Sequence, residues 1–385
     1  MVMRIDERVV VRAAPFGMDL MLSLYSVAAP LLLIELRANP IELGLIGSIT
    51  SAVHMGLANR MGPFSDRIGR RRPILVAPLL FALSCLIAII TGQVKIVLML
   101  SALNGLCLSL FWPPFQAWIA ERPTGSGLAR DIGTLNLAWT AAYVLGPVIS
   151  GFLFSLQAKL PFVFAGTLAL FLFLLSYGSI HDHRATSTQR ESPHPTGALG
   201  RQKSFLYIAW IANFMSFFLL GNVRYQFPKL ARELGVGPQV VGILIGCLGF
   251  SLFAGFFLLR ESSLWHFRRR YLFGTQALAA VGILVLSFAA HPLWFALALI
   301  LIGFSVSVTY YSSLLYAVQL SREKGKGTGW HESVLSLGGM LGPMLGGIAA
   351  YYVGLRAPYL VCFFFLTAAV LAEGVLFRRR TDLPG

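Results

Sequence analysis

The chain has 385 residues, of which 56% are hydrophobic and only 12% are charged. A soluble globular protein carries about 25% charged residues, so this composition excludes an ordinary soluble domain and indicates a chain that lies in a lipid bilayer. The formal net charge of +15 would suit a nucleic-acid-binding protein, but the basic residues lie in short segments between apolar runs and do not form one basic surface. We therefore expect a membrane partner and no nucleic acid.

Twelve apolar segments follow one another along the chain. A helix that spans a membrane needs roughly 20 mainly apolar residues, and the segments are of about this length. They lie at residues 13–36, 41–61, 73–92, 96–119, 131–156, 160–180, 204–228, 239–259, 271–290, 292–319, 328–352 and 357–377. They are too long for membrane strands, and their apolar residues do not alternate with polar ones. The sequence therefore predicts an all-α membrane protein with twelve transmembrane helices.

The basic residues between these segments predict the orientation. If the N-terminus is cytoplasmic, the cytoplasmic segments hold 24 of the 31 lysine and arginine residues, the outer loops hold six, and Arg224 lies within a span. Cytoplasmic loops carry an excess of lysine and arginine. We therefore expect a multi-pass protein of the inner (cytoplasmic) membrane with both termini in the cytoplasm.

The segment 181–203 interrupts this pattern. It is rich in Ser, Thr, Pro and His, which is typical of a flexible linker. We predict that it joins an N-terminal six-helix bundle, residues 1–180, to a C-terminal one, residues 204–385.

The two halves repeat each other. At an offset of 198 residues Gly44 matches Gly242, and Arg70-Arg71-Arg72 matches Arg268-Arg269-Arg270. At an offset of 196, Gly146-Pro147 matches Gly342-Pro343, and Gly151 matches Gly347. Parallel repeats of six helices predict two pseudo-symmetric bundles with a site between them that opens alternately to each side of the membrane.

A glycine- and arginine-rich motif follows the second apolar segment. Its residues are Gly62, Asp66, Arg67, Gly69, Arg70 and Arg71. With this motif the chain resembles the major facilitator superfamily over essentially its full length. The resemblance implies that Asp66 faces the start of helix 11 and helps to close the cytoplasmic side, where a helix N-terminus favours a carboxylate. It implies also that Arg70 and Arg71 pair with acids at nearby helix ends, for which Glu121 and Asp131 are candidates. The alternative is that the motif only sets the orientation.

Small residues and prolines on helices 5 and 11 resemble a motif of the drug–proton antiporters of that family. The residues are Gly146, Pro147, Gly151, Gly338, Gly342, Pro343 and Gly346. Small residues at this spacing let helices approach closely, so plain helix packing is an equal interpretation. One position departs from the pattern. The antiporters usually carry an arginine on helix 4, four residues before a glycine, and here Ser101 takes that place before Gly105.

Four ionisable residues inside the spans are candidates for binding a proton or substrate: Asp19, His54, Arg224 and Glu332. Such groups are costly in a membrane and are often functional. We expect Asp19 and His54 to form a pair, with local packing as the alternative. Arg224 could bind an anionic substrate or pair with Glu35, or it could extend to the membrane surface. Glu332 could simply cap the first turn of helix 11.

Aromatic and amide residues on helices 4, 5, 7 and 10 could line a broad cavity. These are Trp112, Phe115, Trp139, Tyr143, Asn213, Phe217, Tyr310 and Tyr311. Many of them could instead face lipid or neighbouring helices.

These features favour a monomeric secondary transporter that exports hydrophobic or amphipathic small molecules in exchange for protons. The alternatives are a carrier of a small organic anion or polar metabolite, and a membrane sensor that transports nothing. Since the sequence has no nucleotide-binding, zinc-protease or serine-hydrolase motif, we expect no enzyme activity, no cofactor and no metal.

Overall fold

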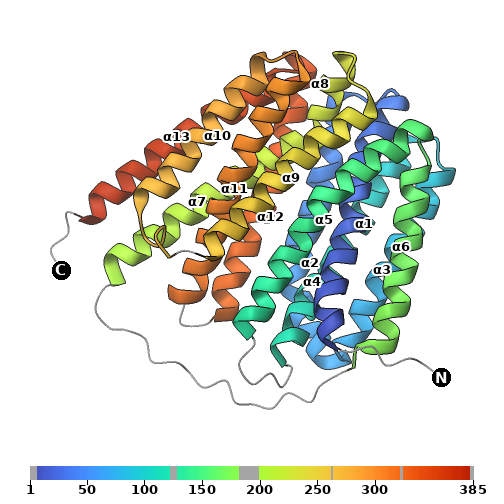
Figure 1. Cartoon of the computed structure of the whole chain (residues 1–385), viewed down its shortest axis with the longest axis horizontal. Helices are drawn as coiled ribbons and strands as arrows, with labels where there is room; N and C mark the ends of the chain where they lie inside the picture. Colours follow the sequence, from blue (N-terminus) through green and yellow to red (C-terminus); the bar gives the residue numbers. More distant parts are fainter. Residues whose placement is uncertain (1–6, 122–127, 182–198, 262, 321–323, 382–385) are drawn as a thin grey trace.

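The computed structural model describes residues 7–121, 128–181, 199–261, 263–320 and 324–381. In these residues the helices, which short turns and loops connect, are the regular secondary structure (Figure 1). The helices are α1 (Glu7–Glu35), α2 (Pro40–Ile68), α3 (Arg71–Ile90), α4 (Val94–Glu121), α5 (Leu128–Leu156), α6 (Leu160–Ser179), α7 (Leu199–Tyr225), α8 (Phe227–Glu233), α9 (Pro238–Arg260), α10 (Arg269–Phe288), α11 (Pro292–Leu320), α12 (Lys324–Tyr352) and α13 (Ala357–Thr381).

Twelve segments of the described chain are long and apolar enough to cross a membrane. The short helix α8 continues α7 after Gln226, so the two count as one span. The predicted all-α membrane protein with twelve spans is therefore confirmed. The predicted end of the second span at residue 61 is wrong, because α2 continues to Ile68.

The start of α2 shows how the sequence defines a helix end. The side chain of Asn39 accepts a hydrogen bond from the backbone N–H of Glu42 at 3.0 Å, and the Glu42 carboxylate accepts one from the N–H of Asn39 at 2.8 Å. Pro40 occupies the first helical position, where a missing N–H costs nothing. This capping box starts α2 directly after the turn that follows α1.

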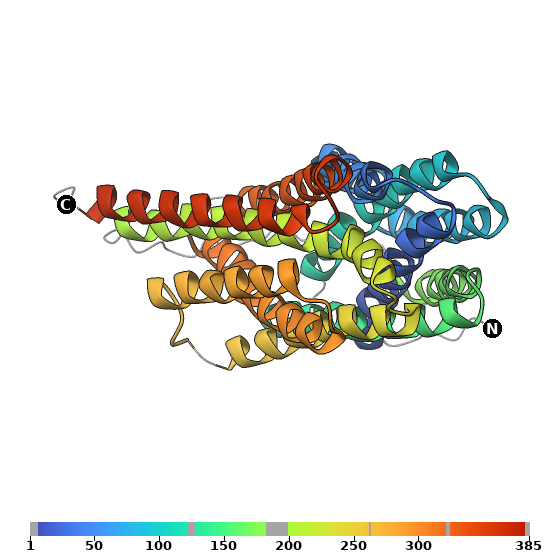
Figure 2. The same ribbon diagram turned by 90° about the horizontal axis from the view of Figure 1, so that it is seen from above.

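The helices form two bundles, one of α1–α6 and one of α7–α13 (Figure 1). In the first, α1 packs against α5 and α6, and α3 packs against α4 and α6. In the second, α11 packs against α7, α9 and α10, and α7 also lies beside α13, as seen from above in Figure 2. The bundles meet along two helix pairs, α5 with α9 and α2 with α12. Helices α1 and α7 also contact each other across the interface, and α11 contributes Tyr310, whose ring contacts Trp139 on α5.

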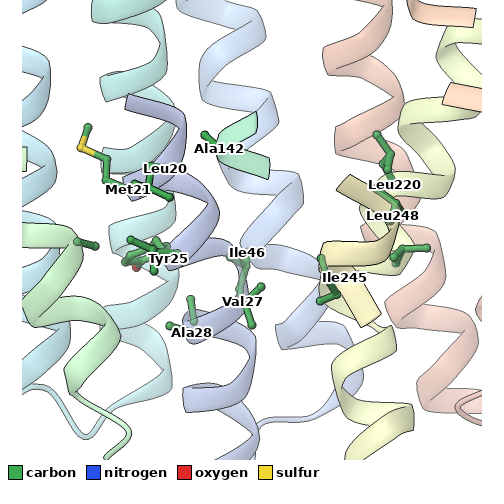
Figure 3. Close-up of a cluster of buried hydrophobic side chains, with 14 of the residues drawn as sticks. Leu20, Met21, Tyr25, Val27, Ala28, Ile46, Ala142, Leu220, Ile245 and Leu248 are labelled. Carbon is green, nitrogen blue, oxygen red and sulfur yellow. The ribbon is translucent and has the colours of Figure 1, made fainter. Parts of the chain in front are cut away.

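One cluster of buried apolar side chains includes residues of both bundles. Figure 3 shows part of it, with Tyr25 and Ala28 of α1 in the first bundle and Leu220 and Ile245 in the second. Tyr25 on α1 has its ring centre 5.8 Å from that of Phe81 and 5.5 Å from that of Phe162, both edge-to-face. Such pairs contribute about 0.5–1.5 kcal/mol each beyond area burial. They hold α1 against α3 and α6, which fixes the position of the polar residues on the other side of α1.

Two glycines allow the bundles to touch. A Cβ atom on Gly44 of α2 would collide with the backbone carbonyl of Pro343 on α12, and one on Gly242 of α9 would collide with the carbonyl of Pro147 on α5. Gly44 and Gly242 are equivalent in the repeat, and so are Pro147 and Pro343. The two contacts are therefore related by the pseudo-symmetry of the bundles.

Candidate functional site

Asp19 lies near the middle of α1 and is 5% exposed. Its carboxyl interacts electrostatically with the guanidinium of Arg224 on α7, and with the phenols of Tyr143 on α5 and Tyr310 on α11. Among the described residues its Oδ2 atom has no hydrogen-bond partner. A buried carboxylate without partners is costly. Asp19 is therefore a buried polar group at the bundle interface, and its neighbours leave part of its hydrogen-bonding capacity unused.

Arg224 lies over an aromatic ring of the opposite bundle. Its Cζ atom is 4.6 Å from the centre of the Tyr143 ring, a cation–π distance. In the part of the chain that the structure describes, Arg224 forms no ion pair, and the considered pair with Glu35 is absent. Arg224 thus points into the interface between α5 and α7.

Aromatic rings from both bundles continue this arrangement. Trp139 on α5 has its ring centre 5.5 Å from Tyr143 and 5.7 Å from Tyr310. Phe217 on α7 lies 6.1 Å from Tyr310. We call Asp19, Trp139, Tyr143, Arg224 and Tyr310 the central cluster. It brings together two of the four ionisable candidates and three of the predicted aromatic residues.

His54 lies apart from the central cluster. Its Nδ1 atom is 3.2 Å from the hydroxyl oxygen of Ser109 on α4, and no hydrogen bond or ion pair between described residues joins it to Asp19. The expected pair is therefore not formed, because α1 packs against α5 and α6, whereas α2 packs against α4 and α12. Although α1 and α2 are consecutive, they are not close neighbours, and His54 serves the contact between α2 and α4.

Glu332 lies on α12 and interacts electrostatically with Tyr310 of the central cluster. The expectation that it occupies the first turn of its helix is wrong, since α12 begins at Lys324. Its neighbour His331 is fully buried, with Nδ1 2.8 Å from the hydroxyl oxygen of Ser313 and its ring 4.8 Å from that of Tyr310. Glu332 therefore interacts with the central cluster from α12, a helix of the second bundle that also contacts the first.

The other predicted cavity residues lie in different surroundings. Phe115 on α4 is fully buried and stacks between Phe111 and Trp118, and Trp112 packs on Phe111. Asn213 on α7 is fully buried, and neither its Oδ1 nor its Nδ2 has a partner among the described residues.

Tyr311 packs against Phe256 of α9, a residue that the sequence alone does not mark as part of the site. Phe256 is 2% exposed and lies 5.6 Å from Trp139 and 5.5 Å from Tyr310. It stands in an apolar run with no signal that separates it from core residues. Only the tertiary structure shows that it supports the central cluster.

The arginine-rich motif lies mostly inside a helix. Residues 62–68 form the end of α2, and only Gly69 and Arg70 separate it from α3. Gly69 has φ +92°, a conformation that favours glycine. Arg70 donates a hydrogen bond to the Gly62 carbonyl at 3.1 Å. The predicted boundary at residue 61 is too early because hydropathy marks only the apolar part of a helix that crosses the bilayer, and the polar residues 62–68 continue the same helix.

Within this turn Asp66 forms an ion pair with Arg70, and the Asp66 side chain is 54% exposed. Arg71 donates to the backbone carbonyl of Tyr177 on α6 at 2.9 Å, and its guanidinium lies 4.9 Å from the Tyr177 ring. The side chains of Glu121 and Asp131, the candidate partners of Arg70 and Arg71, lie outside the described residues. The turn is thus held to α6 in the conformation that the structure shows.

The predicted packing residues lie at helix contacts. Gly338 and Gly342 lie against backbone carbonyls of α7, and Gly346 lies against the Asn222 side chain of α7. Gly146 on α5 meets Ser23 of α1. Gly151 on α5 meets Pro238 and Gly242 of α9. The small residues therefore serve both the packing within each bundle and the contact between bundles.

A family model described as Major Facilitator Superfamily matches residues 13–321 and 209–385 of the chain. Among curated relatives, the Quinolone resistance protein NorA of Staphylococcus aureus (strain COL) is 23% identical over 340 residues, which cover 86% of each chain. Multidrug resistance protein 1 of Bacillus subtilis (strain 168) is 24% identical over 361 residues, which cover 90% of this chain and 88% of that one.

Solved structures share the fold. A bacterial homologue of the human lysosomal transporter Spinster, in an inward-facing and occupied conformation, superposes with a TM-score of 0.76 at 16% identity over 97% of each chain. The nucleoside transporter NupG superposes with a TM-score of 0.73 at 11% identity, over 99% of this chain and 100% of that one. Together with the twelve spans and the matched family model, these findings show that the chain belongs to the major facilitator superfamily, and that it is a transporter and not an enzyme.

Proposed function

We propose that the protein exports hydrophobic or amphipathic small molecules in exchange for protons. The central cluster is the observation that carries this proposal. It places a buried carboxyl, a guanidinium and three aromatic rings, drawn from both bundles, at the bundle interface. Mostly apolar surroundings with a few polar groups are typical of sites for small organic ligands.

Two relatives support the direction and breadth of transport. Their names, Quinolone resistance protein and Multidrug resistance protein 1, refer to resistance to drugs. Export of aromatic compounds is the transport activity that such resistance would need. The partly buried rings of Trp139, Tyr143 and Tyr310 would contact such compounds.

Asp19 is our candidate for the proton site. A single carboxyl that binds either a proton or a cationic group of the substrate makes the two ligands mutually exclusive, and this negative coupling drives exchange. Ser101 stands where the antiporters usually carry an arginine on helix 4. We therefore propose that Arg224 on α7 supplies the positive charge that this arginine would provide. Glu332, which interacts with Tyr310, is a second candidate.

Alternating access would come from movement of residues 1–180 relative to residues 204–385, joined by the linker 181–203. In the described conformation the bundles touch at the end marked by Pro40, where Gln226 donates to the Pro40 carbonyl at 3.0 Å. At the opposite end Asp66 is exposed and binds Arg70 of its own turn. We infer that the structure faces inward and that Asp66 turns toward α12 when that end closes.

The charge distribution supports the orientation of this proposal. Both termini and the arginine-rich turn would lie in the cytoplasm, and the Pro40 end would face outward from the cytoplasmic membrane. Because the central cluster draws on both bundles of one chain, we propose that the transporter works as a monomer.

The test uses the purified protein in liposomes with an imposed pH gradient and ethidium, a fluorescent aromatic cation. We expect accumulation against the ethidium gradient, and release of protons into weakly buffered detergent solution when ethidium is added. Asp19→Asn should abolish both signals, because the amide binds neither a proton nor a cation. Glu35→Gln, at the exposed end of the same helix, should change neither. Normal proton release by Asp19→Asn would contradict the assignment.

A further inference from the structure

An acid and a base reach the interface from opposite bundles without pairing. Asp19 comes from α1 and Arg224 from α7. The two interact electrostatically, yet the described residues include no ion pair between them. Oδ2 of Asp19 has no hydrogen-bond partner in that part of the chain. Since the two charges do not pair with each other, each can bind a charged group of a ligand.

The position of Arg224 over Tyr143 suits it to bind an anion. The Cζ atom of the Arg224 guanidinium lies over the Tyr143 ring, 4.6 Å from its centre, which is a cation–π distance. The N–H donors of the guanidinium lie at its edge, where they match the two oxygens of a carboxylate. Arg224 therefore offers an anion site directly beside an aromatic surface.

A line of aromatic rings runs from Tyr143, which lies under Arg224, to Tyr310, which interacts electrostatically with Asp19. Trp139, Tyr143, Phe217 and Tyr310 come from α5, α7 and α11, and all four are only partly buried. Their ring contacts run from Tyr143 through Trp139 to Tyr310 and Phe217, with centre distances between 5.5 and 6.1 Å. A planar aromatic ligand would find stacking partners along this line.

We propose that the compounds carried by this protein include aromatic zwitterions. The anionic group of such a compound binds Arg224, its cationic group binds Asp19, and its ring system contacts Trp139 and Tyr310. This inference rests on the proposed export function and names the substrate class of the same site. The other ionisable groups around the cluster are Tyr143, Tyr225, Tyr310 and Glu332.

Compounds with one charge fit this site less well. A cation without an anionic group meets the positive charge of Arg224 and leaves it without a counter-ion. An anion without a cationic group meets the negative charge of Asp19. An unpaired charge beside a ligand lowers affinity and so discriminates between ligands. A zwitterion satisfies both side chains at once.

The experiment compares rhodamine B, a planar aromatic zwitterion near neutral pH, with its ethyl ester, a cation of nearly the same shape. Binding to the purified protein is measured by fluorescence anisotropy, and transport by pH-gradient-driven movement in liposomes. Arg224→Gln should weaken binding and transport of rhodamine B by about tenfold to a hundredfold, while binding of the ester stays the same or improves. Arg224→Lys should retain part of the preference. Arg232→Gln, an exposed arginine on α8, should change neither ligand.

Two results would overturn the inference. One is an equal loss of both ligands in Arg224→Gln with gel filtration and thermal unfolding unchanged, and the other is a wild-type protein that prefers the ester. Failure of the proposed function looks different. In that case binding of rhodamine B depends on Arg224 as described, but a pH gradient moves neither compound.

Discussion

The backbone carbonyl of Pro343 on α12 lies directly against Gly44 on α2, at one of the places where the bundles touch. Replacing Gly44 by alanine should therefore weaken the contact by about 1–3 kcal/mol, the usual cost of overpacking. We expect Gly44→Ala to separate the bundles at the Pro40 end and to lower transport. Distances between spin labels on α2 and α12 measure the separation.

Gly56, on the same helix, is the control. Nothing lies within 4 Å of a Cβ placed there, and alanine favours a helix over glycine by about 1 kcal/mol. Gly56→Ala should therefore be neutral or slightly stabilising. Equal label distances in the two variants would show that the Gly44 contact does not hold the bundles together.

Asp66→Asn should have little effect on thermal stability. Its ion pair with Arg70 is half exposed, and such pairs contribute about 0–1 kcal/mol. If Asp66 serves the conformation closed at the cytoplasmic end, the same change should slow transport severalfold and favour the inward-facing state. Labelling of a cysteine placed near Trp330 would report that shift. Glu261→Gln, which removes an exposed pair with Arg260 in the second half, should leave both unchanged.

His54→Gln should leave proton coupling intact. The imidazole contacts Ser109 within the first bundle, and a glutamine can donate to the same hydroxyl. We expect proton release on substrate binding to keep its wild-type pH dependence, with a small loss of thermal stability. A shifted or absent pH dependence would instead place His54 on the proton path.

Glu373 on α13 is fully buried, and its carboxyl accepts a hydrogen bond from the Gln276 side chain on α10 at 2.8 Å. The sequence suggests that Glu373 pairs with Arg378 or reaches the membrane surface. The side chain of Arg378 lies outside the described residues, and the partner that the structure shows is Gln276. The remaining side-chain oxygens, Oε1 of each residue, have no partner among the described residues. A proton on Oε1 of Glu373 would form a hydrogen bond to Oε1 of Gln276. The acid and the amide would then form a cyclic pair with two hydrogen bonds.

Glu373→Gln, which keeps both hydrogen bonds, should therefore unfold near the wild-type temperature. Glu373→Leu should lose about 1–3 kcal/mol, because it leaves the Gln276 amide buried without a partner. Infrared spectra should show a protonated-carboxyl band that disappears in Glu373→Gln. If Glu373→Gln removes a carboxylate band and not a protonated-carboxyl band, Glu373 is ionised and this pairing is wrong.

The sequence alone predicts the helices well, because length and hydropathy determine them. It also identifies Gly44 and Pro343 through the repeat, since equivalent residues recur where equivalent helices touch. It does not predict which helices are neighbours, so the expected Asp19–His54 pair is wrong. The proximity of Asp19 to Arg224 joins residues 205 positions apart in the chain, and no local pattern encodes such a contact.

Tyr225 directly follows Arg224 in α7, so the two residues move together when the helix moves. The Tyr225 ring covers Gly47 of α2, where a Cβ atom would collide with it. When the outer end opens, α2 must withdraw from this ring, and the backbone that moves with Tyr225 also carries Arg224. The anionic group of the substrate would then leave Arg224 as Tyr225 separates from α2, so that substrate release and opening to the outside occur in the same conformational change.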